Sequence, residues 1–256
     1  GSLLGAIDKC RTSMGRRTLK QWILRPLANK SKIEERQDAV ASIARSSKRL
    51  DELRNCLKGL RDMERLATQL SYNRSGGRDL VAIGLALERM PKLKAICMEV
   101  DDFLLNTLAK DLDMLEVMKI DIQANLNDEQ PLSLRDGGLI REGIDKKLDE
   151  LREAAAIGHK WFKDLETKER ARLEIPSLKV RHNRQIGWYI EVTKTHLSKV
   201  PEDWNRRQQM TNGNRYVTEE LIEWEEKLVS ADSKANSIEY NMFRDLRDRC
   251  RENSRI

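Results

Sequence analysis

The sequence has little of what a β-rich fold requires. Aromatic residues make up only 5% of the 256 residues, and there are just 13 glycines and 5 prolines. Sandwiches and barrels join many short strands through turns rich in glycine and proline, so this composition argues against them. Charged residues, by contrast, make up 35% of the chain. We therefore expect long helices with solvated outer faces, arranged in one or two domains.

Paired cysteines and long apolar runs are also missing. The four cysteines lie far apart and form no CxxC pair; they are Cys10, Cys56, Cys97 and Cys250. Since no secretory signal sequence is found either, we expect a reducing, intracellular compartment rather than a disulfide framework. No apolar run approaches the roughly 20 residues that a membrane helix needs, so we expect no membrane partner.

Motifs of common enzymes and metal sites are absent from the sequence as well. It contains neither a GxxxxGKS/T phosphate loop nor an HExxH pair. No cysteine lies at metal-ligand spacing from His159, His182 or His196. His182 alternates with Val180, which predicts a structural histidine on an inward strand face. Glu225 and Glu226 fall on a predicted helix exterior. We therefore predict that the chain is not an enzyme and binds no cofactor or metal.

Helical periodicity dominates the first 130 residues. One apolar stripe, expected to lie in the core, consists of Leu19, Trp22, Ile23 and Leu27. Ser31 stands three residues before Glu34, a capping-box signature that predicts a helix start. The helical pattern is expected to break at residues 75–77 and again at Pro91.

Two stricter patterns follow. From Ile144 to Leu165, and again from Leu221 to Met242, apolar residues recur at alternating steps of three and four, as in a heptad seam. Each seam needs a partner, so we predict that the two helices pair antiparallel, each about 45 Å long. Thr218 is the predicted N-cap of the second helix. Between them, residues 178–182 and 186–192 alternate apolar and polar, which predicts a β-hairpin with its turn at residues 183–185. Residues 205–216 could supply one or two further strands.

The surplus of positive charge is confined to this region. Residues 159–218 contain 13 basic and 7 acidic residues, a surplus equal to the net +6 of the whole chain. Cations interleaved with short amides and hydroxyls suit phosphate oxygens, and no helix is available here to read bases in a major groove. The candidate phosphate-contacting residues are Lys179, Arg181, Asn183, Arg184, Arg206, Arg207, Gln208, Thr211, Asn212, Asn214 and Arg215. A merely solvated polar surface is the alternative interpretation.

Two stretches resemble a known family. Residues 8–27 with 33–40, and residues 135–221 through the segments Arg135-Asp-Gly-Gly138, Gly187-Trp-Tyr-Ile190 and Asn214-Arg-Tyr216, resemble the MutS family of DNA mismatch-repair proteins. The resemblance implies a mainly α fold: a helical core with a long antiparallel two-helix lever arm that carries a small antiparallel β clamp at its tip. It implies a first part of the core and lever at 1–158, a clamp at 159–218 and a returning lever helix at 219–256.

The resemblance also implies a function. The family's clamp holds duplex DNA by its backbone, and Asn183, Arg207, Thr211, Asn212 and Arg215 fall where it touches DNA. Thr211 stands where other members sometimes carry a basic residue, and the pair Gly213-Asn214 is expected to loosen its strand. The family's Phe-x-Glu mismatch wedge and its ATPase loop are not in this sequence, so we expect an excised fragment.

Partners and location follow from the same resemblance. ATP and Mg²⁺ are expected only in an ATPase domain outside this sequence. A second MutS subunit and a MutL-type protein are expected as partners of the full-length protein, and the cytoplasm and nucleoid as its location. The alternative function is a helical scaffold that docks partner proteins rather than DNA.

Overall fold

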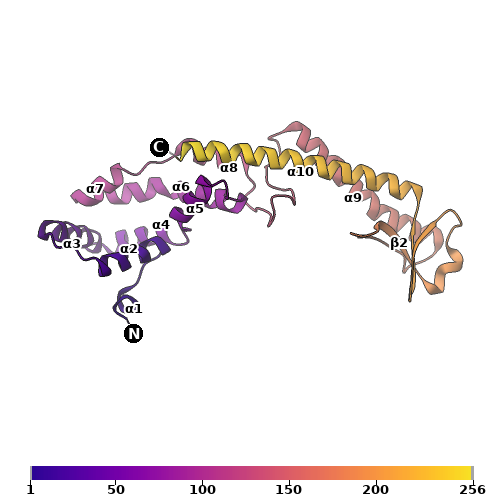
Figure 1. Ribbon diagram of the computed structural model, residues 1–256, viewed down its shortest axis with the longest axis horizontal. Helices are drawn as coiled ribbons and strands as arrows, with labels where there is room; N and C mark the ends of the chain where they lie inside the picture. Colours follow the sequence, from indigo (N-terminus) through magenta and orange to yellow (C-terminus); the bar gives the residue numbers. More distant parts are fainter. Residues whose placement is uncertain (1, 255–256) are drawn as a thin grey trace. The chain divides into compact units, whose positions relative to one another are not determined.

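The computed structural model describes residues 2–254, and they form two compact units. One unit comprises the residues up to Arg141 together with those from Asn241 onward; the other runs from Glu142 to Tyr240. The fold is mainly α with one small antiparallel sheet, as predicted (Figure 1). These units are not the predicted domains, whose limits fall at residues 158 and 218. The predicted limits separate core, clamp and lever by function, so that division stays a prediction.

The first unit is helical. Its helices are α1 (Leu3–Ile7), α2 (Ser13–Leu24), α3 (Lys30–Ala44), α4 (Ser47–Leu57), α5 (Met63–Ser71), α6 (Gly77–Met98), α7 (Phe103–Lys110), α8 (Glu116–Asn125) and the last part of α10 (Glu219–Asn253). Several of these helices begin at an N-cap residue whose side chain accepts a hydrogen bond from a backbone N–H of the first turn. Thr12 is the N-cap of α2, and Asn29 is the N-cap of α3. The start predicted at Ser31 is therefore wrong, because Asn29 caps α3 first. The break predicted at Pro91 is also wrong, since α6 continues through it.

The core of this unit forms where α6 meets α8. Leu80, Ile83 and Leu87 of α6 are buried, as are Met118 and Ile122 of α8. A Cβ at Gly84 would lie 3.0 Å from the Ile122 side chain, so a glycine allows the close approach of these helices. In the same unit, the Arg249 guanidinium donates to both carboxylate oxygens of Asp121, at 2.8 and 3.0 Å, and ties the end of α10 to α8.

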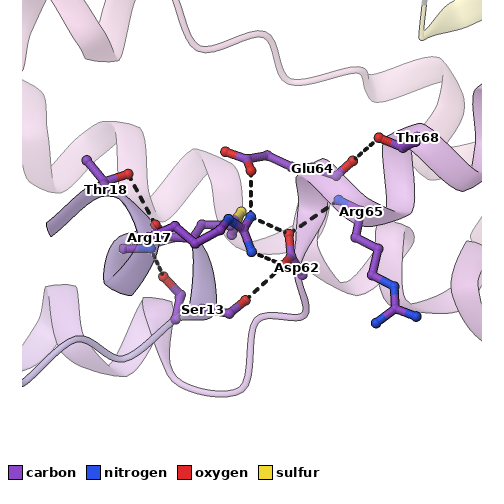
Figure 2. Close-up of polar contacts among 10 residues, drawn as sticks. Ser13, Arg17, Thr18, Asp62, Glu64, Arg65 and Thr68 are labelled. Carbon is purple, nitrogen blue, oxygen red and sulfur yellow. Dashed lines mark hydrogen bonds and ion pairs between the residues drawn. The ribbon is translucent and has the colours of Figure 1, made fainter. Parts of the chain in front are cut away.

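A polar cluster joins α2 to the start of α5 (Figure 2). The Arg17 guanidinium donates to both oxygens of Asp62, one at 2.8 Å, and also to Glu64. Asp62 in turn accepts from the Ser13 hydroxyl at 3.1 Å and from the backbone N–H of Arg65 at 3.3 Å, and so caps α5. Arg17 and these hydrogen bonds hold the pKa of Asp62 well below its usual range.

The second unit contains the predicted helix pair. α9 (Lys146–Leu173) and the first part of α10 pack antiparallel along the two seams, and the Trp161 and Trp224 rings stack with centroids 5.1 Å apart. A Cβ at Gly158 would lie 3.3 Å from Leu228, which shows how closely the helices approach. Thr218 caps α10 through the N–H of Leu221, as predicted. Arg152 of α9 donates to the buried Glu239 of α10 at 2.7 and 3.1 Å.

Between these helices the chain forms a four-stranded antiparallel sheet at one end of the pair (Figure 1). The strands are β1 (Lys179–Asn183), β2 (Gly187–Thr193), β3 (Asn205–Met210) and β4 (Gly213–Val217), in the order β1-β2-β4-β3, with the short 3-10 helix η1 (Lys194–Lys199) after β2. One sheet face packs on the helices. The buried side chains on that face are Val180, Ile190, Val192 and Tyr216. On the same face the Trp188 ring stacks on the Phe162 ring of α9, with the ring centroids 4.0 Å apart.

Candidate nucleic-acid interface

The sheet is fastened to the helices by carboxylates as well as by apolar packing. Glu166 of α9 accepts from the backbone N–H of Val180 at 2.8 Å, and Glu225 of α10 accepts from that of Trp188 at 3.1 Å. Each carboxylate thus holds one strand of the first hairpin. The prediction that Glu225 lies on a solvated helix exterior is wrong, because strand β2 lies against it.

A single cross-strand row crosses the outer face of the sheet. Strand register aligns Lys179, Glu191, Arg215 and Gln208 on β1, β2, β4 and β3. The Arg215 guanidinium lies 4.4 Å from the centre of the Tyr189 ring, donates to Gln208 Oε1 at 2.8 Å and pairs with Glu191 at 3.5 Å. Tyr189 lies on the outward face, but Arg215 covers it and only 4% of it is exposed. Arg215 therefore organises this face and its charge is already balanced by Glu191.

Five cations surround this row. Lys179 and Arg181 on β1, Arg184 in the first turn, and Arg206 and Arg207 on β3 are all exposed. None of them forms an ion pair with any residue from 2 to 254. β1 and β3 are the two outer strands of the sheet. Positive charge is consequently displayed along both edges, with Arg207 at a β-bulge between Arg206 and Gln208.

The turns of the sheet carry polar groups. Thr211 and Asn212 form the two-residue turn between β3 and β4, and both are exposed. The backbone N–H of Lys194 donates to the Asn212 carbonyl at 3.1 Å, which places a further exposed lysine beside this turn. Sequence reasoning missed Lys194, although its charge directly after strand β2 was a usable signal. At the other end, half-buried Asn183 accepts from the Gln185 N–H at 2.8 Å and shapes the first turn.

The structure places three residues differently from the predictions. Asn214 is 6% exposed and donates to the Tyr216 hydroxyl at 3.1 Å, so it faces the helices instead of solvent. His182 pairs with Trp188 on the face that packs on the helices, as predicted, but at the end of β1 its side chain is exposed rather than buried. Gly213 does not loosen its strand: a Cβ there would lie 2.3 Å from the Val192 carbonyl oxygen, so glycine allows β4 to pack closely on β2.

Between residues 2 and 254, no three His, Cys, Asp or Glu side chains lie together in a way that could hold a metal ion. Over the same residues, no helix is both long and apolar enough to cross a membrane.

The fold and this surface define a class: a mainly α-helical protein in which two antiparallel helices carry a small sheet edged with cations. The chain belongs to the MutS family, since it matches the family model of MutS domain III over residues 1–256.

Curated relatives agree with this assignment. The chain is 39% identical over 253 residues to the DNA mismatch repair protein MutS of Halothermothrix orenii and 40% identical over 256 residues to that of Salinibacter ruber. These matches cover 99% and 100% of this chain, but only 28% of each relative. The MutS of Methanothrix thermoacetophila is 39% identical over 249 residues, covering 96% of this chain and 29% of the relative. The chain thus spans little more than a quarter of the length of these proteins.

Proposed function

We propose that the cation-edged sheet binds duplex DNA through its phosphate backbone, without reading sequence. The observation that carries the proposal is the set of five exposed cations without ion-pair partners among residues 2–254, on a sheet that helix carboxylates hold rigidly. Cations that reach phosphates release condensed counterions, which provides most of the free energy of nonspecific binding.

The dimensions of the sheet suit this role. Its two outer strands are three strand spacings apart, roughly 14 Å, which is on the order of the width of the major groove. Cations on β1 and β3 therefore reach separate phosphates rather than compete for one. The exposed amides and hydroxyl of Gln208, Thr211 and Asn212 supply donors that fix register. We leave Asn214 out of the contact set because it is buried.

The proposal assigns binding, and no reaction, to this chain. In a full-length MutS protein we propose that ATP, Mg²⁺ and contacts with a second MutS subunit or a MutL-type protein involve other parts of the polypeptide. The isolated chain should accordingly bind duplex with a dissociation constant of roughly 10⁻⁴–10⁻⁶ M and without preference for a mismatch.

Charge reversal on the sheet tests the proposal. Arg206→Glu/Arg207→Glu should abolish binding of a labelled duplex, measured by fluorescence anisotropy. Lys146→Glu/Lys147→Glu is the matched control: it makes the same charge change in the same unit, but at the start of α9, about 24 Å of helix before Phe162, which contacts the sheet. Equal loss in both variants would mean that only net charge matters. Unchanged binding in the first variant, or a clear preference for mismatched duplex, would contradict the proposal and favour the helical scaffold that docks proteins.

A further inference from the structure

Helix α2 is amphipathic, yet no residue of its apolar side is fully buried in the described chain. It is the one helix of eight residues or more, among residues 2–254, that has no buried residue. Trp22 is 43% exposed and Leu24 68% exposed. The stripe through Leu19, Trp22 and Ile23, predicted to lie in the core, is therefore not buried within this chain. An apolar helix face that stays exposed marks a surface for a partner.

The exposed face borders a groove between α2 and α3. The groove has a volume of about 540 Å³, and its apolar lining residues are Trp22, Pro26, Leu27, Ile33, Val40 and Ala41. Val40 is 65% exposed. The volume falls within the range of roughly 300–1,000 Å³ in which proteins enclose drug-sized ligands, so it accommodates several apolar side chains. All of these residues belong to the first unit.

Basic residues outnumber acidic ones in the segment that forms the groove. From the start of α2 to the end of α3, residues 13–44 contain seven basic and three acidic residues. Arg36 lines the groove with its guanidinium 4.0 Å from the centre of the Trp22 ring. Lys20, Arg25 and Lys32 stand close to lining residues in sequence and are exposed, and like Arg36 they form no ion pair with another residue from 2 to 254. The acidic residues of α3, Glu34, Glu35 and Asp38, line a different hollow.

We propose that this groove docks an amphipathic helix of a partner protein, with an apolar stripe flanked by acidic residues. The apolar stripe would fill the groove between α2 and α3, and acidic residues beside it would pair with Arg36 and the neighbouring cations. A second copy of this chain fits poorly, because a two-fold contact would place the basic surface against itself. A nucleic acid fits poorly too, because phosphates gain nothing from an apolar lining.

A synthetic peptide tests the docking site with the full 256-residue chain. The probe is a fluorescein-labelled helix of about 18 residues, long enough to form a helix, with leucines at helical spacing and glutamates beside them. We expect it to bind in anisotropy titrations, while a scrambled sequence and a version with lysine for glutamate do not. Val40→Asp should weaken binding by about tenfold or more, because it places a charge in the apolar contact. The matched control is Val117→Asp on α8, a site of similar exposure (69%), which should change nothing.

Reversing the charge of Arg36 distinguishes a specific ion-pair contact from a general loss of structure. Arg36→Glu should weaken the acidic peptide and strengthen the lysine peptide, a reversal that a general loss of structure does not produce. The proposal is overturned if the acidic peptide fails to bind, or if Val40→Asp leaves its affinity unchanged. Equal binding of acidic and basic peptides also overturns it. So does sedimentation showing a dimer that Val40→Asp dissociates, since a second copy would then occupy the groove.

Discussion

Gly187 links the conformation of the first hairpin to its attachment on α10. Its φ is +74°, a left-handed conformation that costs an L-residue with a side chain about 1–2 kcal/mol. A Cβ at this position would also lie 2.2 and 2.6 Å from the two carboxylate oxygens of Glu225. The carboxylate must then swing away and lose the hydrogen bond from Trp188 N–H, which is worth about 1.5–3 kcal/mol with a charged acceptor.

Gly187→Ala should therefore lower the free energy of unfolding of the second unit by about 2.5–5 kcal/mol. Urea unfolding followed by tryptophan fluorescence measures this, since Trp161, Trp188, Trp204 and Trp224 all belong to this unit. In a Glu225→Ala background the hydrogen bond is already gone, so the same change should cost only about 1–2 kcal/mol. Equal costs in both backgrounds, or a cost below about 1 kcal/mol in the wild type, would refute this reasoning.

Two further predictions concern the first unit. Because Arg17 lowers the pKa of Asp62 in the folded state, the ion pair stabilises the protein above the unfolded pKa and is lost as pH falls through the folded one. The Tm difference between wild type and Arg17→Met should thus narrow below about pH 4, and a constant difference would contradict it. Burial, with Asp121 nearby, raises the pKa of the Cys250 thiol to about 12, so iodoacetamide at pH 8 should modify exposed Cys10 and spare Cys250 until the chain unfolds. Mass spectrometry showing equal rates would contradict this second prediction.

The helix pair and the sheet could be predicted because their signals are periodic. The apolar seam from Leu221 to Met242 is buried only when it packs against the seam of another helix. The pairing of the two helices follows from that requirement alone. Alternation along β2 likewise predicted which residues share a face. The positive charge of residues 159–218 could be counted directly from the sequence.

The details of the site could not be predicted in the same way. Period-2 alternation leaves open which face of β4 meets the helices, and that choice buries Asn214 against Tyr216. The bulge at Arg207 changes register on β3, and no local pattern announces it. Apolar periodicity also predicted that the apolar stripe of α2 lies in the core, but α2 has no buried residue. A helical pattern shows that one side of a helix is apolar, and it does not show whether the surface that buries this side belongs to the same chain.

The salt dependence of duplex binding tests the central claim most directly. If the five exposed cations of β1, β3 and the first turn contact phosphates and Lys194 does not, log K should fall with log salt at a slope of about −4.5, which is roughly a 500-fold loss from about 50 to 200 mM. Arg206→Gln/Arg207→Gln should bring the slope to about −2.7, a loss of only about 40-fold over the same range, while Lys146→Gln/Lys147→Gln should keep the wild-type slope. A wild-type slope retained by Arg206→Gln/Arg207→Gln would contradict the claim that the sheet holds the DNA backbone.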